Sequence, residues 1–155
     1  MAGTTDLVVN GERVTVRADA RTSLARVLRE QLRCTSVKLA CERGECGACT
    51  VLVGGVPRMA CVTPARLVGR EVVTAEGLGE EARDLQEAFA DHGAFQCGFC
   101  TAGQLVHAVA VLRGPVPGGA ELEPYVRRRL SGNICRCTGY NGLVDAVCAV
   151  AEART

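Results

Sequence analysis

The sequence predicts an α+β protein in which a small sheet domain is followed by an all-α domain of four helices. The prediction rests on a change of hydrophobic period. Short β-prone runs fill the chain to about residue 75, and a spacing near 3.6 begins at Gly77. The chain has 155 residues, 48% of them hydrophobic, which is enough for two small cores. We therefore expect one domain over residues 1–75 and a second over residues 76–155.

The first domain opens with a β-hairpin. Residues 6–17, DLVVNGERVTVR, hold two β-prone runs around Asn10 and Gly11, a dipeptide that tolerates the positive φ angles of a tight turn. Thr22 or Ser23 can then cap a helix. The apolar residues of this helix keep helical spacing: Leu24, Val27, Leu28 and Leu32.

A second hairpin and a short strand complete the first domain. The stretch TVLVGGVPRMACV is predicted to turn at Gly54 and Gly55, and REVVTAE has the composition of a short strand. We expect the helix to lie across the resulting sheet, which makes a small α+β domain.

The second domain follows a joint at residues 75–81, AEGLGEE, and is predicted to hold four helices. The first ends near Gly93, and the second is stopped by Gly114 and Pro115. Pro124 suits the first turn of the third helix. The fourth carries an apolar stripe formed by Leu143, Ala146, Val147, Val150 and Ala151.

Composition and charge argue against several partners and locations. The formal net charge is +1 and charged residues are spread along the chain, so neither nucleic acid nor a membrane is expected as a partner. No apolar stretch approaches the roughly 20 residues that span a bilayer. The stretch MAGTTDLVVNGERV lacks a basic segment followed by an apolar run, so we expect a cytoplasmic protein.

Ten cysteines in such a chain require an explanation. A reducing compartment disfavours disulfides, and the chain is long and rich in aliphatic residues for a secreted disulfide scaffold. Metal ligation is therefore the favoured role of the thiols.

The first cysteine set comprises Cys41, Cys46, Cys49 and Cys61. Its spacing, C-x4-C-x2-C followed by one distant cysteine, is that of plant-type 2Fe-2S ferredoxins. Gly44 and Gly47 suit such a site, because wrapping a cluster bends the chain sharply and brings backbone amides close to the sulfurs. A structural zinc site is the alternative, although zinc usually takes two short ligand pairs.

The second cysteine set comprises Cys97 and Cys100 in QCGFC, and Cys135 and Cys137 in CRC. Both pairs precede predicted helices, whose N-termini would direct partial positive charge toward bound thiolates. Taken alone, the C-x2-C pair also fits a zinc half-site or a redox dithiol. Together the pairs make a second four-thiolate site, which favours an anionic cluster.

Three motifs, CERGECGACTVL, QCGFCTAGQ and GNICRCTGY, occur in this order along the chain. With them the chain resembles the small iron-sulfur subunit of the xanthine dehydrogenase, or molybdenum hydroxylase, family, and the resemblance covers nearly its whole length. It implies a ferredoxin-like β-grasp domain followed by a four-helix domain. Each domain would hold one 2Fe-2S cluster, the first on the first cysteine set and the second on the second.

The resemblance also implies a function and two partners. A large subunit with a molybdenum-pterin cofactor would oxidatively hydroxylate an aldehyde, a purine or an N-heterocycle, and a medium subunit would carry FAD, giving a heterotrimer. This chain would be an oxidoreductase subunit without a substrate site or catalytic residues of its own. It would carry electrons from molybdenum through the second cluster and then the first to the flavin. Gln96 and Cys137 match positions that approach the pterin in family members.

Two other functions fit the residues. A free-standing ferredoxin-like carrier would need no large partner, and a zinc-stabilised interaction module would be spectroscopically silent. The substrate cannot be inferred from this chain, because the pocket that selects it would belong to another subunit.

Overall fold

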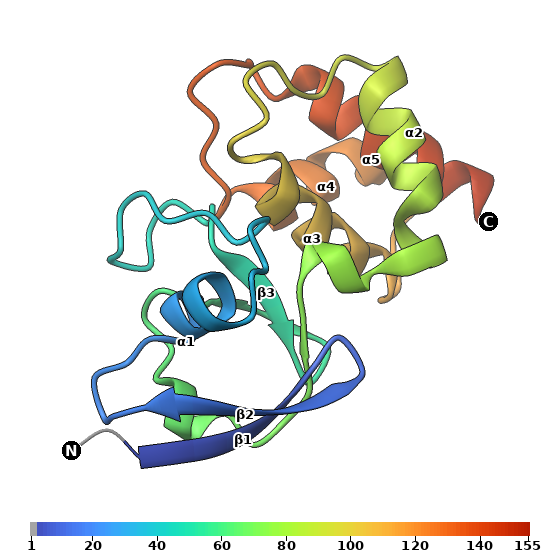
Figure 1. Cartoon of the computed structure of the whole chain (residues 1–155). Coiled ribbons are helices and arrows are strands. Elements are labelled where there is room, and N and C mark those ends of the chain that lie inside the picture. The colour runs from blue at the N-terminus through green and yellow to red at the C-terminus, as the bar shows by residue number, and fades with distance from the viewer. Residues whose placement is uncertain (1–2) are drawn as a thin grey trace.

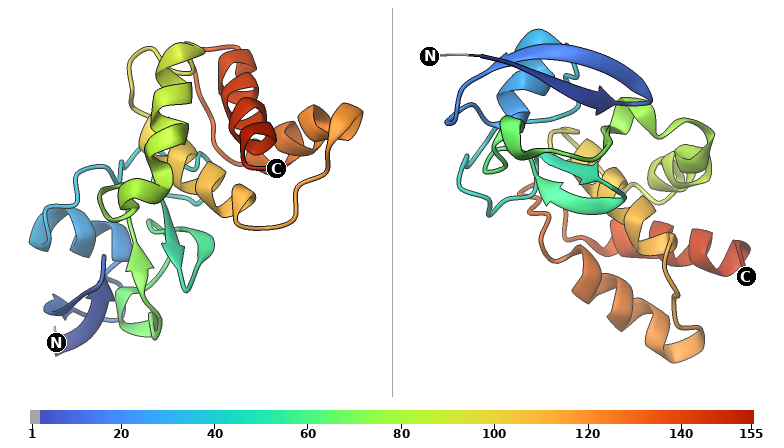
Figure 2. Two further views of the ribbon diagram at one scale, coloured as in Figure 1. Left: turned by 90° about the vertical axis from the view of Figure 1, so that its right-hand side faces the viewer. Right: turned by 90° about the horizontal axis from the view of Figure 1, so that it is seen from below.

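The computed structural model describes residues 3–155, which form a mixed five-stranded sheet followed by a helical half (Figure 1). The predicted α+β class is confirmed. Figure 2 shows the two halves side by side, with the strands gathered in one and most helices in the other. Within residues 3–155, no helix is both long and apolar enough to cross a bilayer.

The sheet has the strand order β2-β1-β5-β3-β4. Its strands are β1 (Gly3–Val9), β2 (Glu12–Ala18), β3 (Thr50–Val53), β4 (Val56–Met59) and β5 (Val72–Val73). β1 pairs antiparallel with β2, and β3 pairs antiparallel with β4. The short central strand β5 joins the two hairpins, running parallel to β1 and antiparallel to β3.

Both predicted hairpin turns are confirmed. Asn10 and Gly11 have φ angles of 51° and 84°, and Gly54 and Gly55 have φ angles of 59° and 80°. Two successive positive φ angles give a turn whose twist matches that of the flanking strands. The dipeptides therefore fix the register of both hairpins.

The helix that crosses the sheet is less regular than the sequence predicts. Ser23 caps α1 (Leu24–Arg26) by accepting a hydrogen bond from the Arg26 amide, and the chain then continues as a π-helical segment, Val27–Gln31. The amide of Leu32 donates to the carbonyl of Val27, five residues back, which widens the turn. The predicted cap is confirmed, and the expectation of a regular α-helix to Leu32 is wrong.

The joint between the halves is folded and partly buried. Two short 3₁₀ segments, Ala75–Gly77 and Gly79–Ala82, occupy the predicted joint. Leu78 and Ala82 are buried in the core of the helical half. The chain therefore leaves β5 and enters the second core without a flexible linker.

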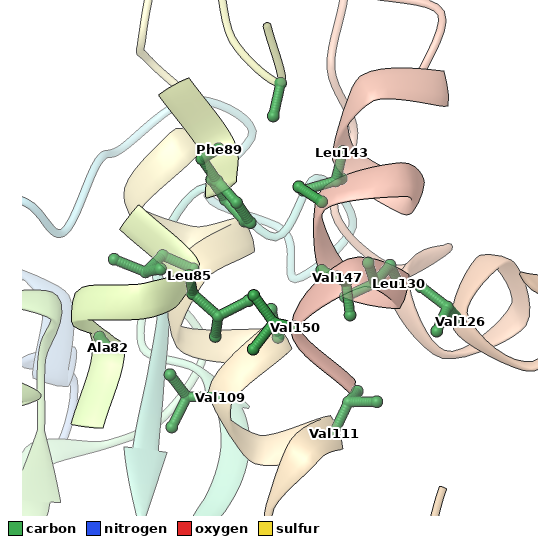
Figure 3. Packing of buried hydrophobic residues seen from close by; sticks show 14 of the residues in the cluster. Ala82, Leu85, Phe89, Val109, Val111, Val126, Leu130, Leu143, Val147 and Val150 are labelled. Atoms are coloured by element: carbon green, nitrogen blue, oxygen red, sulfur yellow. The ribbon is translucent and has the colours of Figure 1, made fainter. Parts of the chain in front are cut away.

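The helical half contains α2 (Arg83–Asp91), α3 (Thr101–Leu112), α4 (Leu122–Leu130) and α5 (Asn141–Ala153). Its core lies where side chains of α2, α3, α4 and α5 meet (Figure 3). Phe89 and Leu85 from α2 approach Leu143, Val147 and Val150 from α5, and nearly all of their surface is buried. Fully burying a side chain of this size stabilises the fold by about 1.5–3 kcal/mol.

Strand β3 belongs to both cores. Val51 lies in the core under α1, whereas the next residue, Leu52, lies in the core of the helical half. Successive side chains of a strand point to opposite faces, so β3 forms a wall that both halves share. α3 covers the helical side of this wall (Figure 1).

Helix α3 approaches the sheet half closely at Gly103. A Cβ atom at this position would lie 2.5 Å from the carbonyl oxygen of Gly47. Contacts below about 3 Å cannot be accommodated between two backbones without movement. Gly103 therefore sets the distance between α3 and the loop that precedes β3.

We predict that Gly103→Ala lowers the apparent Tm, although alanine normally stabilises a helix interior by about 1 kcal/mol over glycine. The clash with Gly47 should cost about 1–3 kcal/mol and outweigh that gain. Thermal unfolding followed by circular dichroism measures the balance. Gly118→Ala is the matched control, because Gly118 has φ −100° and nothing lies within 4 Å of its added Cβ. A rise in Tm for Gly103→Ala would contradict the close packing.

Candidate metal centres

The loop before β3 directs backbone amides at one sulfur. Cys41 Sγ accepts hydrogen bonds from the amides of Arg43, Glu45 and Cys46 over 3.4, 3.5 and 3.4 Å. These three donors lower the pKa of Cys41 to about 6, led by the Arg43 amide. Such a site favours a thiolate, the form that binds metal.

Positive backbone angles produce this arrangement. Glu42, Gly44 and Gly47 have φ angles of 51°, 77° and 72°, which bend the loop around the Cys41 sulfur. This agrees with the role expected for the two glycines. Gly47 is restricted further, because an added Cβ would lie 2.4 Å from the carbonyl oxygen of Gly132.

The second hairpin brings the remaining two thiols of the first set together. Cys49 directly precedes β3 and Cys61 lies just beyond β4, so the hairpin places them side by side. The Cys61 amide donates to Cys49 Sγ over 3.4 Å. Burial raises the pKa of Cys49 to about 12 despite this hydrogen bond, so Cys49 would have to release its proton to bind a metal.

The second cysteine set is also brought together. Cys97 and Cys137 lie on the surface with their sulfurs 3.5 Å apart, and Cys100 and Cys135 are buried near each other. Cys100 directly precedes α3, as expected. Residues 138–140 separate Cys137 from α5, which begins at Asn141. Contrary to the prediction from the sequence, the second pair therefore does not directly adjoin a helix N-terminus.

The two buried thiols have different surroundings. Burial raises the pKa of Cys100 to about 12. Burial acts most strongly, to raise the pKa of Cys135, but the hydroxyl and amide of Thr138 together with the Cys137 amide and Cys100 lower it to about 7. The Thr138 amide and hydroxyl donate to Cys135 Sγ over 3.4 and 3.2 Å. Donors are therefore already directed at one of the two buried sulfurs, that of Cys135.

In both sets the cysteines lie together two by two: the amides of Cys46 and Cys61 donate to the sulfurs of Cys41 and Cys49, and the sulfurs of Cys97 and Cys137 are 3.5 Å apart. Among residues 3–155, no three His, Cys, Asp or Glu side chains gather closely enough to hold a single metal ion. A tetrahedral zinc site would need four donors around one point. A binuclear cluster needs two thiolates at each of two irons, and cysteines that lie in pairs are compatible with that need, as are amide and hydroxyl donors with the negative charge of a cluster.

A buried asparagine links the two sets, and the sequence alone did not indicate this role. Asn133 Nδ2 donates to the Gly47 carbonyl over 2.9 Å and to Thr50 Oγ1 over 3.1 Å. Its Oδ1 bonds to His107 Nδ1. Because the amide nitrogen is occupied as a donor, Oδ1 must accept, so the proton of His107 lies on Nδ1. The signal in the sequence was a polar residue two positions before the CRC motif, but its partners in the sheet half are more than 80 residues away.

His107 supports this link as a neutral side chain. Burial and the nearby Arg129 lower its pKa, against the opposing effect of the hydrogen bond to Asn133. Next to Asn133, the amide of Ile134 donates to the carbonyl of Cys46 over 2.8 Å. The backbone that carries Cys135 is therefore hydrogen-bonded to the backbone that carries Cys46.

Comparisons with known proteins agree with two cluster-binding regions. A family model described as a 2Fe-2S iron-sulfur cluster binding domain matches residues 7–67, and one described as a [2Fe-2S] binding domain matches residues 74–148.

Curated relatives cover most of the chain. It is 49% identical to the nicotine 6-hydroxylase small subunit of Paenarthrobacter nicotinovorans, over 92% of this chain and 86% of the relative. It is 39% identical to a probable xanthine dehydrogenase subunit of Bacillus subtilis, over 93% of this chain and 83% of the relative.

A solved structure matches nearly completely. A chain of quinoline 2-oxidoreductase from Pseudomonas putida 86 superposes with a TM-score of 0.87 at 42% identity, over 98% of this chain and 95% of that chain.

We predict that Asn133→Ala destabilises the chain by about 1–3 kcal/mol, because the Gly47 carbonyl, Thr50 and His107 lose a shared partner inside the protein. Denaturant unfolding measures the change. Asn141→Ala is the matched control, since Asn141 is exposed and bonds only to the surface residue Arg127 over 3.1 Å. Equal stability of the two variants would show that the buried link contributes little.

Proposed function

The chain belongs to the iron-sulfur subunits of the xanthine dehydrogenase family of molybdenum hydroxylases, and from this we propose that it passes electrons between two partner subunits. It is a subunit of an oxidoreductase and contains two 2Fe-2S binding domains. When bound, each cluster supplies a site that takes up and releases one electron. Residues of this chain would hold the two sites and connect them.

The proposed ligands are the two cysteine sets. Cys41, Cys46, Cys49 and Cys61 would hold one cluster, and Cys97, Cys100, Cys135 and Cys137 would hold the other. The pairwise grouping of the sulfurs and the donors aimed at them support this assignment. We also propose the corresponding domains, a ferredoxin-like β-grasp domain over 1–75 and a four-helix domain over 76–155.

The observation that carries the proposal is the hydrogen bond of 2.8 Å between the Ile134 amide and the Cys46 carbonyl. Ile134 precedes one proposed ligand, and Cys46 is itself a ligand of the other set. A route through Cys135, Ile134 and Cys46 therefore crosses between the sets through covalent bonds and one hydrogen bond. Asn133 would hold this crossing in place from the next position along the chain.

The outer face of the second set supports contact with the large subunit. Cys97 and Cys137 are exposed, and Phe95, Phe99 and Ile134 lie close to them in the sequence with 41–53% of their surface exposed. Apolar side chains that are exposed next to such cysteines are typical of an interface with another protein. We propose that this face meets a large molybdenum-pterin subunit, and that Gln96 and Cys137 contact its cofactor.

The first set has a second apolar surface beside it. Val62 follows Cys61 and is 52% exposed, and Leu67 is 80% exposed. We propose that this surface meets a medium FAD subunit, which would receive the electrons. A free-standing carrier would have no evident need for two apolar faces, each beside a cysteine set, so the subunit role is favoured over that alternative.

The substrate class is proposed from the relatives. Their names refer to nicotine, xanthine and quinoline, and a further relative, 40% identical, is an aldehyde oxidoreductase iron-sulfur-binding subunit of Escherichia coli. We propose that the assembled enzyme oxidatively hydroxylates an N-heterocycle, a purine or an aldehyde.

All ten cysteines are free, which supports a cytoplasmic location.

We predict about four irons per purified chain, two for each cluster, and two distinguishable electron paramagnetic resonance signals after reduction. The reason is that the two sets lie in unlike surroundings, one in a glycine-rich loop and one beside helix α3. Metal analysis and low-temperature spectra of the reduced chain measure both quantities. Stoichiometric zinc, or a single signal from fully loaded protein, would refute the assignment.

We predict that Gln96→Ala leaves iron content and both signals intact but slows reduction of the clusters by substrate in the assembled enzyme. Gln96 is exposed beside Cys97, so its loss should remove a contact to the partner's cofactor without disturbing a core. Rapid-mixing spectroscopy measures the rate, and Gln86→Ala, an exposed glutamine on α2, is the control. A wild-type rate at full molybdenum occupancy would remove Gln96 from the electron path.

A further inference from the structure

A glutamine next to the second cysteine set is buried with one polar group unpaired among residues 3–155. Gln104 lies on α3 one turn after Cys100 and is fully buried. Its Oε1 accepts a hydrogen bond from the Cys100 thiol over 3.5 Å, but its Nε2 has no partner in the described chain. A buried amide group left unpaired costs about 1–3 kcal/mol, so a native protein is expected to provide a partner.

The residue that follows Cys100 repeats this pattern. The hydroxyl oxygen of Thr101 is also buried without a partner among the described residues. Two unpaired polar groups therefore lie within four positions of one buried thiol. Both can donate a hydrogen bond, and what the site lacks is an acceptor.

Metal binding would change Cys100 from a donor into an acceptor. A thiol that ligates iron has lost its proton and can no longer donate to Gln104 Oε1. Turning the amide by half a revolution about its last bond exchanges Oε1 and Nε2 with almost no change of shape. Nε2 would then point at the Cys100 sulfur, so that a donor and not a second acceptor faces the thiolate, and Oε1 would take the position that Nε2 leaves.

We propose that Gln104 donates an N–H···S hydrogen bond to metal-bound Cys100 and thereby raises the reduction potential of the cluster in the helical half. The proposal rests on the proposed function, because it requires a cluster at the second set. Reduction adds negative charge to the cluster and its sulfurs, so a donor stabilises the reduced state more than the oxidised state. The interaction is strong because Gln104 is shielded from water.

Gln104 would complete a set of donors around the inner sulfurs. Cys135 already accepts hydrogen bonds from the Thr138 amide and hydroxyl, and it lies near Cys100. The outer sulfurs of Cys97 and Cys137 are exposed instead. Gln104 therefore acts as a positioning and tuning residue on the side of the cluster that faces away from solvent.

The test is a redox titration of the full chain monitored by electron paramagnetic resonance. Gln104→Met keeps the length of the side chain but removes the donor. We expect it to lower the equilibrium constant for reduction of the helical-half cluster about tenfold. This corresponds to a fall of about 59 mV in the reduction potential of a one-electron couple, and the potential of the other cluster should not change. Leu105→Met, a buried substitution on the same helix, is the control and should move neither potential.

Several outcomes separate this inference from the proposed function. If the wild-type chain takes up no iron at the second set, the proposed function fails. If both clusters load and Gln104→Met leaves both potentials unchanged, only the role of Gln104 is overturned.

A second measurement covers the case in which Gln104→Met does not load its cluster. Pulsed electron paramagnetic resonance can be measured on a chain that keeps Gln104 and carries ¹⁵N in its glutamine side chains. It reports directly on the contact between the Gln104 amide and the reduced cluster. A Gln96→Ala background removes the other glutamine near the set. A side-chain ¹⁵N coupling to the reduced cluster supports the hydrogen bond, and its absence overturns it.

Discussion

The side-chain amide of Asn133 is the constraint on which the relation between the two halves depends. It lies in the helical half, one residue after Gly132, and its donors reach Gly47 and Thr50 in the sheet half. Gly47 tolerates no larger side chain, because an added Cβ there would meet the Gly132 carbonyl and Asn133 itself. The cysteine loop before β3 and the CRC segment are thereby held in contact. Any change in the angle between the halves must first break this buried group of hydrogen bonds.

The surroundings of the thiols divide the second set into an inner and an outer side. Cys100 and Cys135 are buried, and Cys135 accepts hydrogen bonds from Thr138, whereas Cys97 and Cys137 are exposed near Phe95 and Phe99 in the sequence, which are also exposed. The proposed transfer of electrons between partner subunits would need one side that is fixed and another that is accessible. The inner side points toward the first set, since Ile134 precedes Cys135 and bonds to Cys46.

Features set by neighbouring residues could be predicted from the sequence, and features set by distant contacts could not. The turns at Asn10-Gly11 and Gly54-Gly55 follow from the backbone freedom of those residues, and they occur as expected. The grouping of the cysteines follows from their spacing. The widened turn after Arg26 depends on how the chain packs under the sheet, and Gln104 looked like an ordinary helix residue. Asn133 became informative only when its partners from the other half were in place.

The shared wall formed by β3 has a consequence for how the chain is made. The face of β3 that carries Leu52 is covered by α3, so it stays bare during synthesis until Leu112 has left the ribosome. At about 5–20 residues per second this interval lasts several seconds. During that time the nascent sheet presents an uncovered apolar face next to the edge strand β4, the arrangement most prone to pairing with other chains. Because of this order of translation, the sheet half depends on the helical half, which is made after it, for solubility as well as for electron transfer.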